Sequence, residues 1–299
     1  MSTFLESDSH RAEIIAYIAK GQLPLKYAYA GSAAHTHDAL AQLETYASVV
    51  GSDEVREVAS FLRGHAGDQI VEIGPGNGRH SAALLATAGH YGRYLGLDFS
   101  RTLLGIAAQS LRSGGVRADT ALWDVEQGPT TAIADWRRGP SPVVVLFLGQ
   151  TLGNVEDVPA TLRNIRESLR PGDRLLLGLS ARVPGATAED YLAPYRNETF
   201  RRAALEPLLA VGVPADAIDD RLGYENDEVV VDAVLRTAVT LDDAELAAGE
   251  RVRCFRSRRF QAAEVVGLLA DGGWSTDRLQ LDDTAGRLIV GAVAADPDE

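Results

Sequence analysis

An α/β fold with a doubly wound parallel sheet is predicted by the order of apolar segments in the middle of the chain. Short segments rich in Val, Leu and Ile alternate there with helical patterns or loops, as in sheets whose parallel strands are joined by crossovers. The clearest of the helices ends at Pro171-Gly172. The expected strands cover residues 69–73, 94–97, 119–123, 143–148 and 174–179.

The alternation breaks at Pro184-Gly185, and a differently patterned segment follows. Residues 198–211 are expected to form a helix there, and residues 228–241 and 250–257 are expected to form strands. The 228–241 strand is longer than usual and is expected to bend. The chain then resumes its first pattern with an expected helix and two strands, over residues 262–271, 275–282 and 287–294.

Two domains follow from this break. Residues 1–184 and 258–299 are expected to form the α/β domain, including a helical N-terminal segment, and residues 185–257 an inserted α+β domain. An insert at this point would lie over the carboxyl ends of the parallel strands, where ligands bind in such sheets, so it is a candidate substrate-binding domain. The expected N-terminal helices cover residues 10–20, 36–46 and 54–63.

Composition limits the kinds of partner. The 299-residue chain has a net charge of −13, whereas nucleic acids and anionic membranes attract clustered Lys and Arg. The arginines of residues 251–259 alternate with apolar residues, as on a strand with a charged outer face. We therefore expect a small-molecule substrate, no nucleic acid and no membrane; the sequence leaves the oligomeric state open.

The single cysteine, Cys254, rules out an intrachain disulfide, and no His/Cys cluster has the spacing of metal ligands. We therefore expect no metal. The N-terminus lacks the pattern of a secretory signal, and no apolar run has the length of a membrane span. These features predict a cytoplasmic protein.

A glycine-rich turn follows the first expected strand. Gly74, Gly76 and Gly78 need no room for a Cβ atom, so a ligand can lie against their backbone before the next helix opens. Asp98 ends the next strand, twenty residues after Gly78, where a carboxylate can accept hydrogen bonds from both ribose hydroxyls. The two features together predict an adenosine pocket.

The glycine spacing distinguishes two classes of cofactor. A dinucleotide fingerprint requires a third glycine three residues after the second, and Arg79 occupies that position. Glycines at every second position, with the acidic Glu72 two residues before the first, are typical of class I methyltransferases that use S-adenosylmethionine (SAM). Glu72 can organise the loop around a cationic sulfonium, whereas it would repel a pyrophosphate. SAM is therefore the expected cofactor in a Rossmann-like domain.

Two further polar sites follow later strands. Asp124 can accept from the adenine amino group while the Val125 amide donates to the ring; the alternative is an aspartate that caps the next turn. Asn154 closes a block with two glycines after the fourth strand, where the methyl donor would face its acceptor. It can hold a carboxylate or an amine, and its alternative is an ordinary turn asparagine.

Over nearly its whole length the chain resembles the histidine-specific methyltransferase family, which methylates the α-amino group of histidine. The resemblance rests on residues 26–29, 72–78, 147–154, 193–195 and 249–260. It implies that Asn154 and Tyr195, the candidate catalytic residues, grip the substrate α-carboxylate. It also implies that Tyr46 lines the amino-group side and that Tyr29 is a further pocket tyrosine.

The chain departs from the family where the substrate side chain is recognised. The family binds the imidazole through Glu-x-Ser on the inserted strand, and Phe255 and Ser257 occupy those positions here. Losing the carboxylate should cost about 1.5–3 kcal/mol of recognition, so histidine is not the expected acceptor. Phe255 favours an apolar or aromatic amino acid, while Arg253, expected on the same strand face, could pair an added acidic group.

The predicted function is SAM-dependent methylation of the amino group of an amino acid or a related small molecule. Alignment of amine, methyl and sulfur would supply much of the rate acceleration. Two alternatives stay open: use of another SAM carbon, as in cyclisation of its aminocarboxypropyl chain, and a non-catalytic SAM-binding protein.

Overall fold

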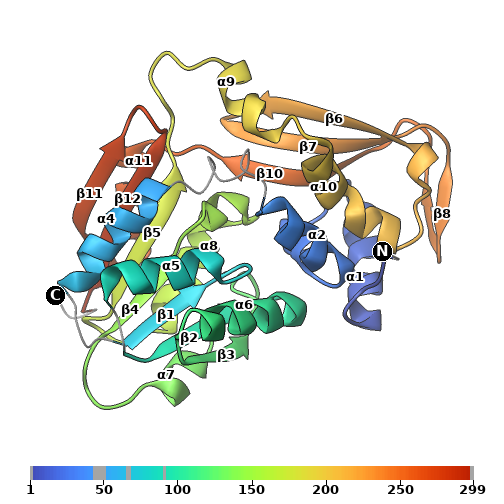
Figure 1. The fold of residues 1–299 in the computed structure, drawn as a ribbon. Coiled ribbons are helices and arrows are strands. Elements are labelled where there is room, and N and C mark those ends of the chain that lie inside the picture. Colours follow the sequence, from blue (N-terminus) through green and yellow to red (C-terminus); the bar gives the residue numbers. More distant parts are fainter. Residues whose placement is uncertain (1–2, 43–51, 65–68, 90–91, 297–299) are drawn as a thin grey trace. The chain divides into compact units, whose positions relative to one another are not determined.

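The computed structural model describes residues 3–42, 52–64, 69–89 and 92–296 (Figure 1). The chain forms two compact units, which are described separately. The first, here called the insert unit, comprises Met1–Ser48, Ser100–Thr102 and Gly185–Arg258. The second, here called the sheet unit, comprises Val49–Phe99, Leu103–Pro184 and Arg259–Glu299.

A seven-stranded sheet forms the centre of the sheet unit, in the order β11-β12-β5-β4-β1-β2-β3. Strands β1 to β5 are parallel, whereas β12 runs antiparallel to β5 and β11 antiparallel to β12. The predicted doubly wound α/β fold is confirmed. The strands are β1 (Gln69–Ile73), β2 (Tyr94–Asp98), β3 (Ala118–Leu122), β4 (Val143–Phe147), β5 (Arg174–Ser180), β11 (Trp274–Asp282) and β12 (Arg287–Ala294).

Helices cover both faces of this sheet, so all five residues of β1 are buried. Because successive side chains alternate between faces, Val71 packs with Leu162 and Leu269 on one side, and Ile70 packs with Phe61 and Leu84 on the other. The helices are α4 (Ser52–Arg63), α5 (Arg79–Ala88), α6 (Arg101–Ser113), α7 (Ala132–Trp136), α8 (Val158–Glu167) and α11 (Ala262–Asp271), with the 3-10 turn η2 (Thr151–Asn154) after β4.

The insert unit contains a three-stranded antiparallel sheet in the order β10-β7-β6 and a separate hairpin, β8-β9. Its strands are β6 (Ile218–Glu225), β7 (Glu228–Leu235), β8 (Val239–Leu241), β9 (Ala244–Leu246) and β10 (Arg251–Arg258). Its helices are α1 (Asp8–Ile18), α2 (Ser32–Leu40), α9 (Ala188–Leu192) and α10 (Glu198–Ala210), with the 3-10 turns η1 (Leu25–Tyr29), η3 (Ala193–Tyr195) and η4 (Ala215–Ala217).

The strand expectations for this unit were wrong in three places, one of which is the short strand β9, which no expected strand covered. The single strand expected over residues 228–241 is divided into β7 and β8. Strand β6 was not predicted at all, because most of its positions are half-buried and its sequence carries no clean apolar alternation. It lies at the edge of its sheet, where it pairs with β7.

The N-terminal helices α1 and α2 belong to the insert unit by their contacts, whereas α4 belongs to the sheet unit. This differs from the boundaries expected from the sequence, which placed residues 1–184 in one domain. Leu25, Ala28 and Leu40 lie in the same apolar cluster as Phe200 and Phe255. Short helical segments bury their apolar side chains only by packing on another element, and here that element is the insert. Within the described ranges, no helix combines the length and apolar character needed to cross a membrane.

Candidate functional site

The order of the sheet places a topological switch point between β1 and β4. These strands are neighbours, and the chain proceeds from β1 to β2 and β3 on one side and from β4 to β5 on the other. In such sheets the ligand lies in the crevice outside the carboxyl ends of the two central strands. The glycine loop of residues 74–78 follows β1 at this edge, and the polar loop of residues 148–154 follows β4 (Figure 1).

The glycine loop has the backbone conformation that its residues predict. Gly74, Gly76 and Gly78 all have left-handed φ values, of 68°, 57° and 74°. A Cβ atom on Gly78 would lie 2.7 Å from the carbonyl oxygen of Ala107, so only glycine allows this approach of α6. A Cβ on Gly76 would meet no described atom within 4 Å. The loop is therefore packed against protein on one side and open at Gly76.

Glu72 lies inside the sheet unit, on the face of β1 that α4 and α5 cover. Its carboxylate is buried and accepts a hydrogen bond from the Tyr94 hydroxyl at 2.6 Å. Burial raises the pKa of Glu72, although the hydrogen bond from Tyr94 opposes the shift. The residue thus ties β1 to β2 immediately below the glycine loop.

The ends of β1, β2 and β3 are aligned by backbone hydrogen bonds. The Gly74 N–H donates to the Leu97 carbonyl at 2.8 Å, and the Trp123 N–H donates to the Asp98 carbonyl at 2.9 Å. Asp98, the residue after Leu97, therefore lies beside the start of the glycine loop. A carboxylate at this point fits the ribose of a nucleoside bound over Gly76.

Asp124 takes part in the turn after β3. Its Oδ1 accepts from the Glu126 N–H at 3.1 Å, which is the local capping role that the sequence left as the alternative. The Val125 carbonyl accepts from Asn164 Nδ2 at 2.8 Å, which fixes the turn against α8. These bonds hold Val125 and its amide in place; an adenine contact by either residue stays a prediction.

Asn154 ends the η2 turn in the loop after β4. The Thr151 methyl group of this turn lies 3.4 Å from the position a Cβ would take on Gly74, so the two loops at the switch point are in contact. The Oδ1 atom of Asn154 is buried and accepts no hydrogen bond from any described residue. Buried amide oxygens are normally hydrogen-bonded, so this one fits a site completed by a ligand.

The candidate substrate residues of the insert unit come together in one aromatic cluster. Tyr195 and Phe255 have ring centroids 5.5 Å apart, and Phe200 lies 4.9 Å from the first and 4.8 Å from the second. The Tyr195 hydroxyl lies 3.5 Å from Ser257 Oγ. All four side chains are buried. The structure thus joins Tyr195, Phe255 and Ser257, which the sequence separates by about sixty residues.

Tyr29 packs at the edge of this cluster, and its ring lies 4.7 Å from that of His37 in an edge-to-face contact. Burial lowers the pKa of His37 to about 4, so the imidazole is neutral near pH 7. His37 was not predicted as a site residue; the available signal was its helical spacing with the buried Ala33 and Leu40. Tyr46 lies outside the described residues.

Strand β10 corrects one expectation about specificity. Arg253 pairs with Asp232 of β7 and Phe255 pairs with the adjacent Val231, so Cys254 is an extra residue in a β-bulge. Arg253 and Phe255 therefore lie on opposite faces of the sheet, and the expectation that they share a face was wrong. The bulge reverses the alternation, which a sequence pattern with period two does not reveal.

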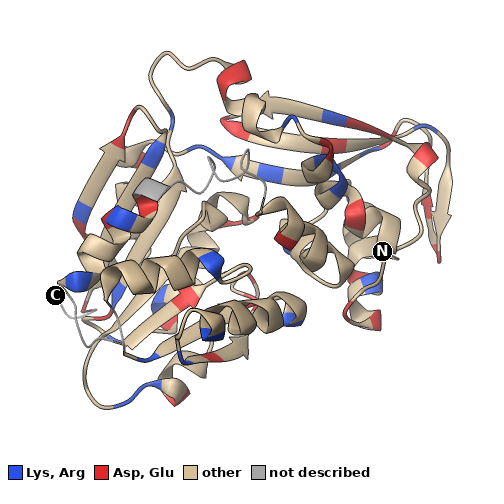
Figure 2. Cartoon of the chain, in the orientation of Figure 1, with Lys and Arg blue, Asp and Glu red and all other residues tan. Residues whose placement is uncertain are grey.

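Figure 2 colours the basic residues of β10 blue and the acidic residues of β6 and β7 red. Three arginines of β10 form ion pairs with acidic residues of these two strands. Arg253 donates to Asp232 at 2.6 Å and also binds Glu225. Arg251 and Arg256 form ion pairs with Glu225 and Glu228. Arg251, Arg253 and Arg256 thus belong to an ion-paired strand face within the insert unit.

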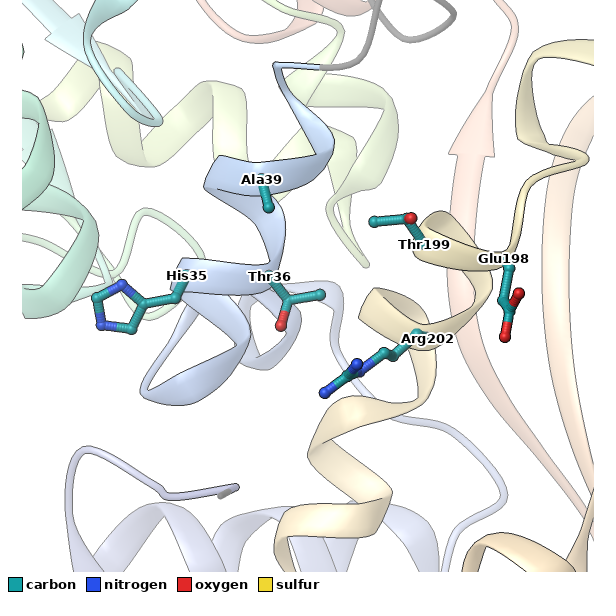
Figure 3. A pocket seen from close by; sticks show the side chains of 6 residues that line it. All are labelled: His35, Thr36, Ala39, Glu198, Thr199 and Arg202. Atoms are coloured by element: carbon teal, nitrogen blue, oxygen red, sulfur yellow. The ribbon is translucent and has the colours of Figure 1, made fainter. Parts of the chain in front are cut away.

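A cavity of about 390 Å³ lies between α2 and α10 of the insert unit (Figure 3). Arg202 and Thr36 point toward one another across it, and His35, Ala39, Glu198 and Thr199 complete its lining. Glu198 and Glu206 flank Arg202 at one helical turn on either side, and Glu206 accepts from the Thr36 hydroxyl at 2.5 Å. The cavity contains none of the sequence-predicted site residues, and its charges are nearly balanced.

Comparison with known families identifies the protein class. A model of the family described as "Histidine-specific methyltransferase, SAM-dependent" matches residues 16–205, which is more than half of the chain. The chain belongs to this family. The description of this family names SAM, so the expected cofactor is confirmed.

More distant similarity extends to other methyltransferases. The chain is 26% identical over 157 residues to phosphoethanolamine N-methyltransferase 1 of Triticum aestivum, covering 52% of this chain and 30% of that protein. It is 29% identical over 116 residues to 2-phytyl-1,4-naphtoquinone methyltransferase of Synechococcus elongatus, covering 36% of this chain and 44% of that protein. The chain thus spans less than half the length of these relatives.

A solved SAM-dependent methyltransferase from Clostridium acetobutylicum shares the fold. Its TM-score is 0.50 at 11% identity, over 88% of this chain and 98% of that chain. At this identity the comparison supports the fold alone. The residues at the switch point fit SAM independently of this comparison. The space beside Gly76 is open, and Asp98 lies beside the glycine loop.

Proposed function

We propose that the protein transfers the methyl group of SAM to the amino group of an amino acid, or of a closely related small molecule, other than histidine. The observation that carries this proposal is the buried Oδ1 atom of Asn154, which has no hydrogen-bond donor among the described residues. An amine N–H supplies such a donor. If the carboxamide is turned by 180°, its Nδ2 instead donates to a carboxylate.

Each part of the site has a role in this reaction. The glycine loop and Asp98 would hold the nucleoside of SAM, whose sulfonium supplies an electrophilic methyl group when it is bound. Asn154 and Tyr195 would orient the acceptor through its amino and carboxylate groups. Holding amine and methyl in line accounts for much of the acceleration, so the site needs little acid or base chemistry.

The acceptor side chain is constrained by the aromatic cluster. Phe255 contacts Tyr195 and Phe200, so an imidazole placed against it would lose the hydrogen-bond partner that a carboxylate provides. Arg253 faces the other side of β10 and is already paired with Asp232 and Glu225, which argues against an acidic acceptor held by this arginine. An apolar or aromatic side chain, with Ser257 as its polar neighbour, fits these contacts best.

Incubation of the purified protein with SAM and each amino acid tests the proposal, with products identified by mass spectrometry. We expect S-adenosylhomocysteine together with a methylated apolar or aromatic amino acid. Methylthioadenosine without a methylated acceptor would instead indicate cyclisation of the aminocarboxypropyl chain. No product despite SAM binding would indicate a non-catalytic SAM-binding protein.

A further inference from the structure

Glu54 of α4 places a buried carboxylate in the interior of the sheet unit. The residue is 3% exposed, and a Cβ atom on Gly178 would lie 2.1 Å from its Oε1. The carboxylate therefore rests directly on the backbone of β5, where a glycine makes room for it. Charged groups are rarely buried in this way without a specific contact.

The contacts of this carboxylate connect the two loops of the switch point. The backbone N–H of Gly149, in the loop after β4, donates to it. His80 Nε2, in the first turn of the helix that follows the glycine loop, lies 3.4 Å from Glu54 Oε2. One side chain thus contacts both the loop that carries Asn154 and the helix that begins at the cofactor loop.

The loop after β4 has a backbone that needs such support. Gly149 and Gln150 both have φ values of 65°, in the left-handed region, which a glutamine adopts only at a cost. The Gln150 N–H donates to the Gly178 carbonyl at 3.1 Å. Glu54 and Gly178 together therefore hold this turn, and η2 and Asn154 follow it directly.

We propose that Glu54 is a positioning residue for the methyl acceptor, acting by fixing the Gly149–Gln150 turn and thereby the carboxamide of Asn154. The proposal rests on the proposed function. Glu54 does not need to touch the acceptor. Its contact with His80 lets the same side chain set the spacing between the acceptor loop and the cofactor helix.

The ionisation of Glu54 gives this arrangement a measurable signature. Burial raises the pKa of Glu54 to about 7, against the opposing effects of Arg287 and the Gly149 N–H; Glu72 and Glu57 add to the rise. Burial lowers the pKa of the facing His80 to about 4, so the imidazole is neutral in this range. The carboxylate form accepts the Gly149 N–H more strongly than the protonated form does.

Hydrogen exchange of the full-length protein bound to S-adenosylhomocysteine tests the turn without reference to any acceptor. We expect Glu54→Ala to speed exchange in a peptide covering residues 148–154 by about tenfold, the scale for losing one charged hydrogen bond. Glu54→Gln, which keeps an acceptor oxygen, should restore most of the protection. Glu57→Ala, one turn away on α4, is the matched control.

Kinetics with the acceptor found in the amino-acid screen complete the test. We expect Glu54→Ala to raise the acceptor KM about tenfold with an unchanged Kd for SAM. In the wild type, the acceptor KM should change near pH 7, where Glu54 changes its protonation state. Glu54→Gln should keep the acceptor KM within a few-fold of the wild-type value at pH 8, and its KM should not change near pH 7. Exchange equal to that of Glu57→Ala, or faster exchange with an unchanged KM, would overturn the proposal. A screen that finds no acceptor contradicts the proposed function, while the exchange result still decides whether Glu54 holds the turn.

Discussion

Arg253 and Phe255 face opposite sides of the insert sheet although they are two residues apart on β10. The extra residue, Cys254, makes Arg253 pair with Asp232 and Phe255 with Val231. The aromatic ring consequently packs on Tyr195 and Phe200, while the guanidinium is held by carboxylates on the other side. This separation underlies the specificity proposed for the enzyme.

The first prediction concerns the cofactor site. Asp98→Ala should weaken binding of SAM and S-adenosylhomocysteine by about 1.5–3 kcal/mol, because hydrogen bonds between a carboxylate and the ribose hydroxyls are lost. Isothermal titration calorimetry measures this change, with the exposed Asp283→Ala as control. The wild type should bind SAM and not NAD. Binding of NAD as tight as that of SAM, or tighter, would contradict the assignment of SAM as the cofactor.

The second prediction separates acceptor binding from cofactor binding. Asn154→Ala and Tyr195→Phe should each raise the acceptor KM or lower kcat, and should leave the Kd for SAM unchanged within about twofold. Removal of one hydrogen bond to a charged carboxylate corresponds to about ten- to a hundredfold in acceptor kcat/KM. Steady-state kinetics and calorimetry on the same preparations provide the two values. Unchanged acceptor kinetics in both variants would exclude them from the site.

The third prediction concerns specificity. The wild type should methylate histidine poorly, and Phe255→Glu should raise histidine turnover while lowering activity on the native acceptor. The gain should be modest, because residues around the new carboxylate are not arranged to support it. Thr240→Glu, which adds a carboxylate on β8, controls for added charge. Efficient methylation of histidine by the wild type would contradict the role given to Phe255.

The fourth prediction concerns the pH dependence of stability. The pKa of Glu54 rises from 4.5 to about 7 on folding, so its stabilising contribution is complete below pH 4.5 and is lost as the pH rises through 7. His80 acts in the opposite direction, because its pKa falls from 6.5 to about 4 and its contribution is lost as the pH falls through 4. The two effects largely cancel in the wild type between pH 4.5 and 6.5.

Single substitutions should reveal the two contributions. The free energy of unfolding of Glu54→Gln relative to wild type should increase by up to roughly 3 kcal/mol as the pH rises from 4.5 to 8. The same difference for His80→Gln should decrease over pH 4 to 6.5. Urea unfolding at a series of pH values gives both curves. Parallel curves for wild type and Glu54→Gln would show that Glu54 has an ordinary pKa.

Much of the sheet unit could be predicted because its signals are local. Strand β1 was expected over its observed range, Gln69–Ile73, and the other parallel strands to within one residue at each end. The glycine loop was likewise predictable, since left-handed φ values at Gly74, Gly76 and Gly78 are a property of single residues. The nature of the cofactor followed from the spacing of these glycines and from Arg79.

The insert unit and the support of the site depended on contacts between distant residues. Three features arise from pairing or burial that no short window of sequence contains: the bulge at Cys254, the unpredicted β6, and the packing of η1 and α2 against the rest of the insert unit. In the sequence, Glu54 looks like an ordinary exposed acid at the start of a helix, so nothing marked it as buried. Only the fold places it on Gly178, beside Gly149 and His80. The sequence by itself therefore determined the sheet and its cofactor loop, whose conformations are encoded residue by residue. The tertiary structure decided which faces meet and which carboxylates are buried, because burial and strand register are set by residues far apart in the chain.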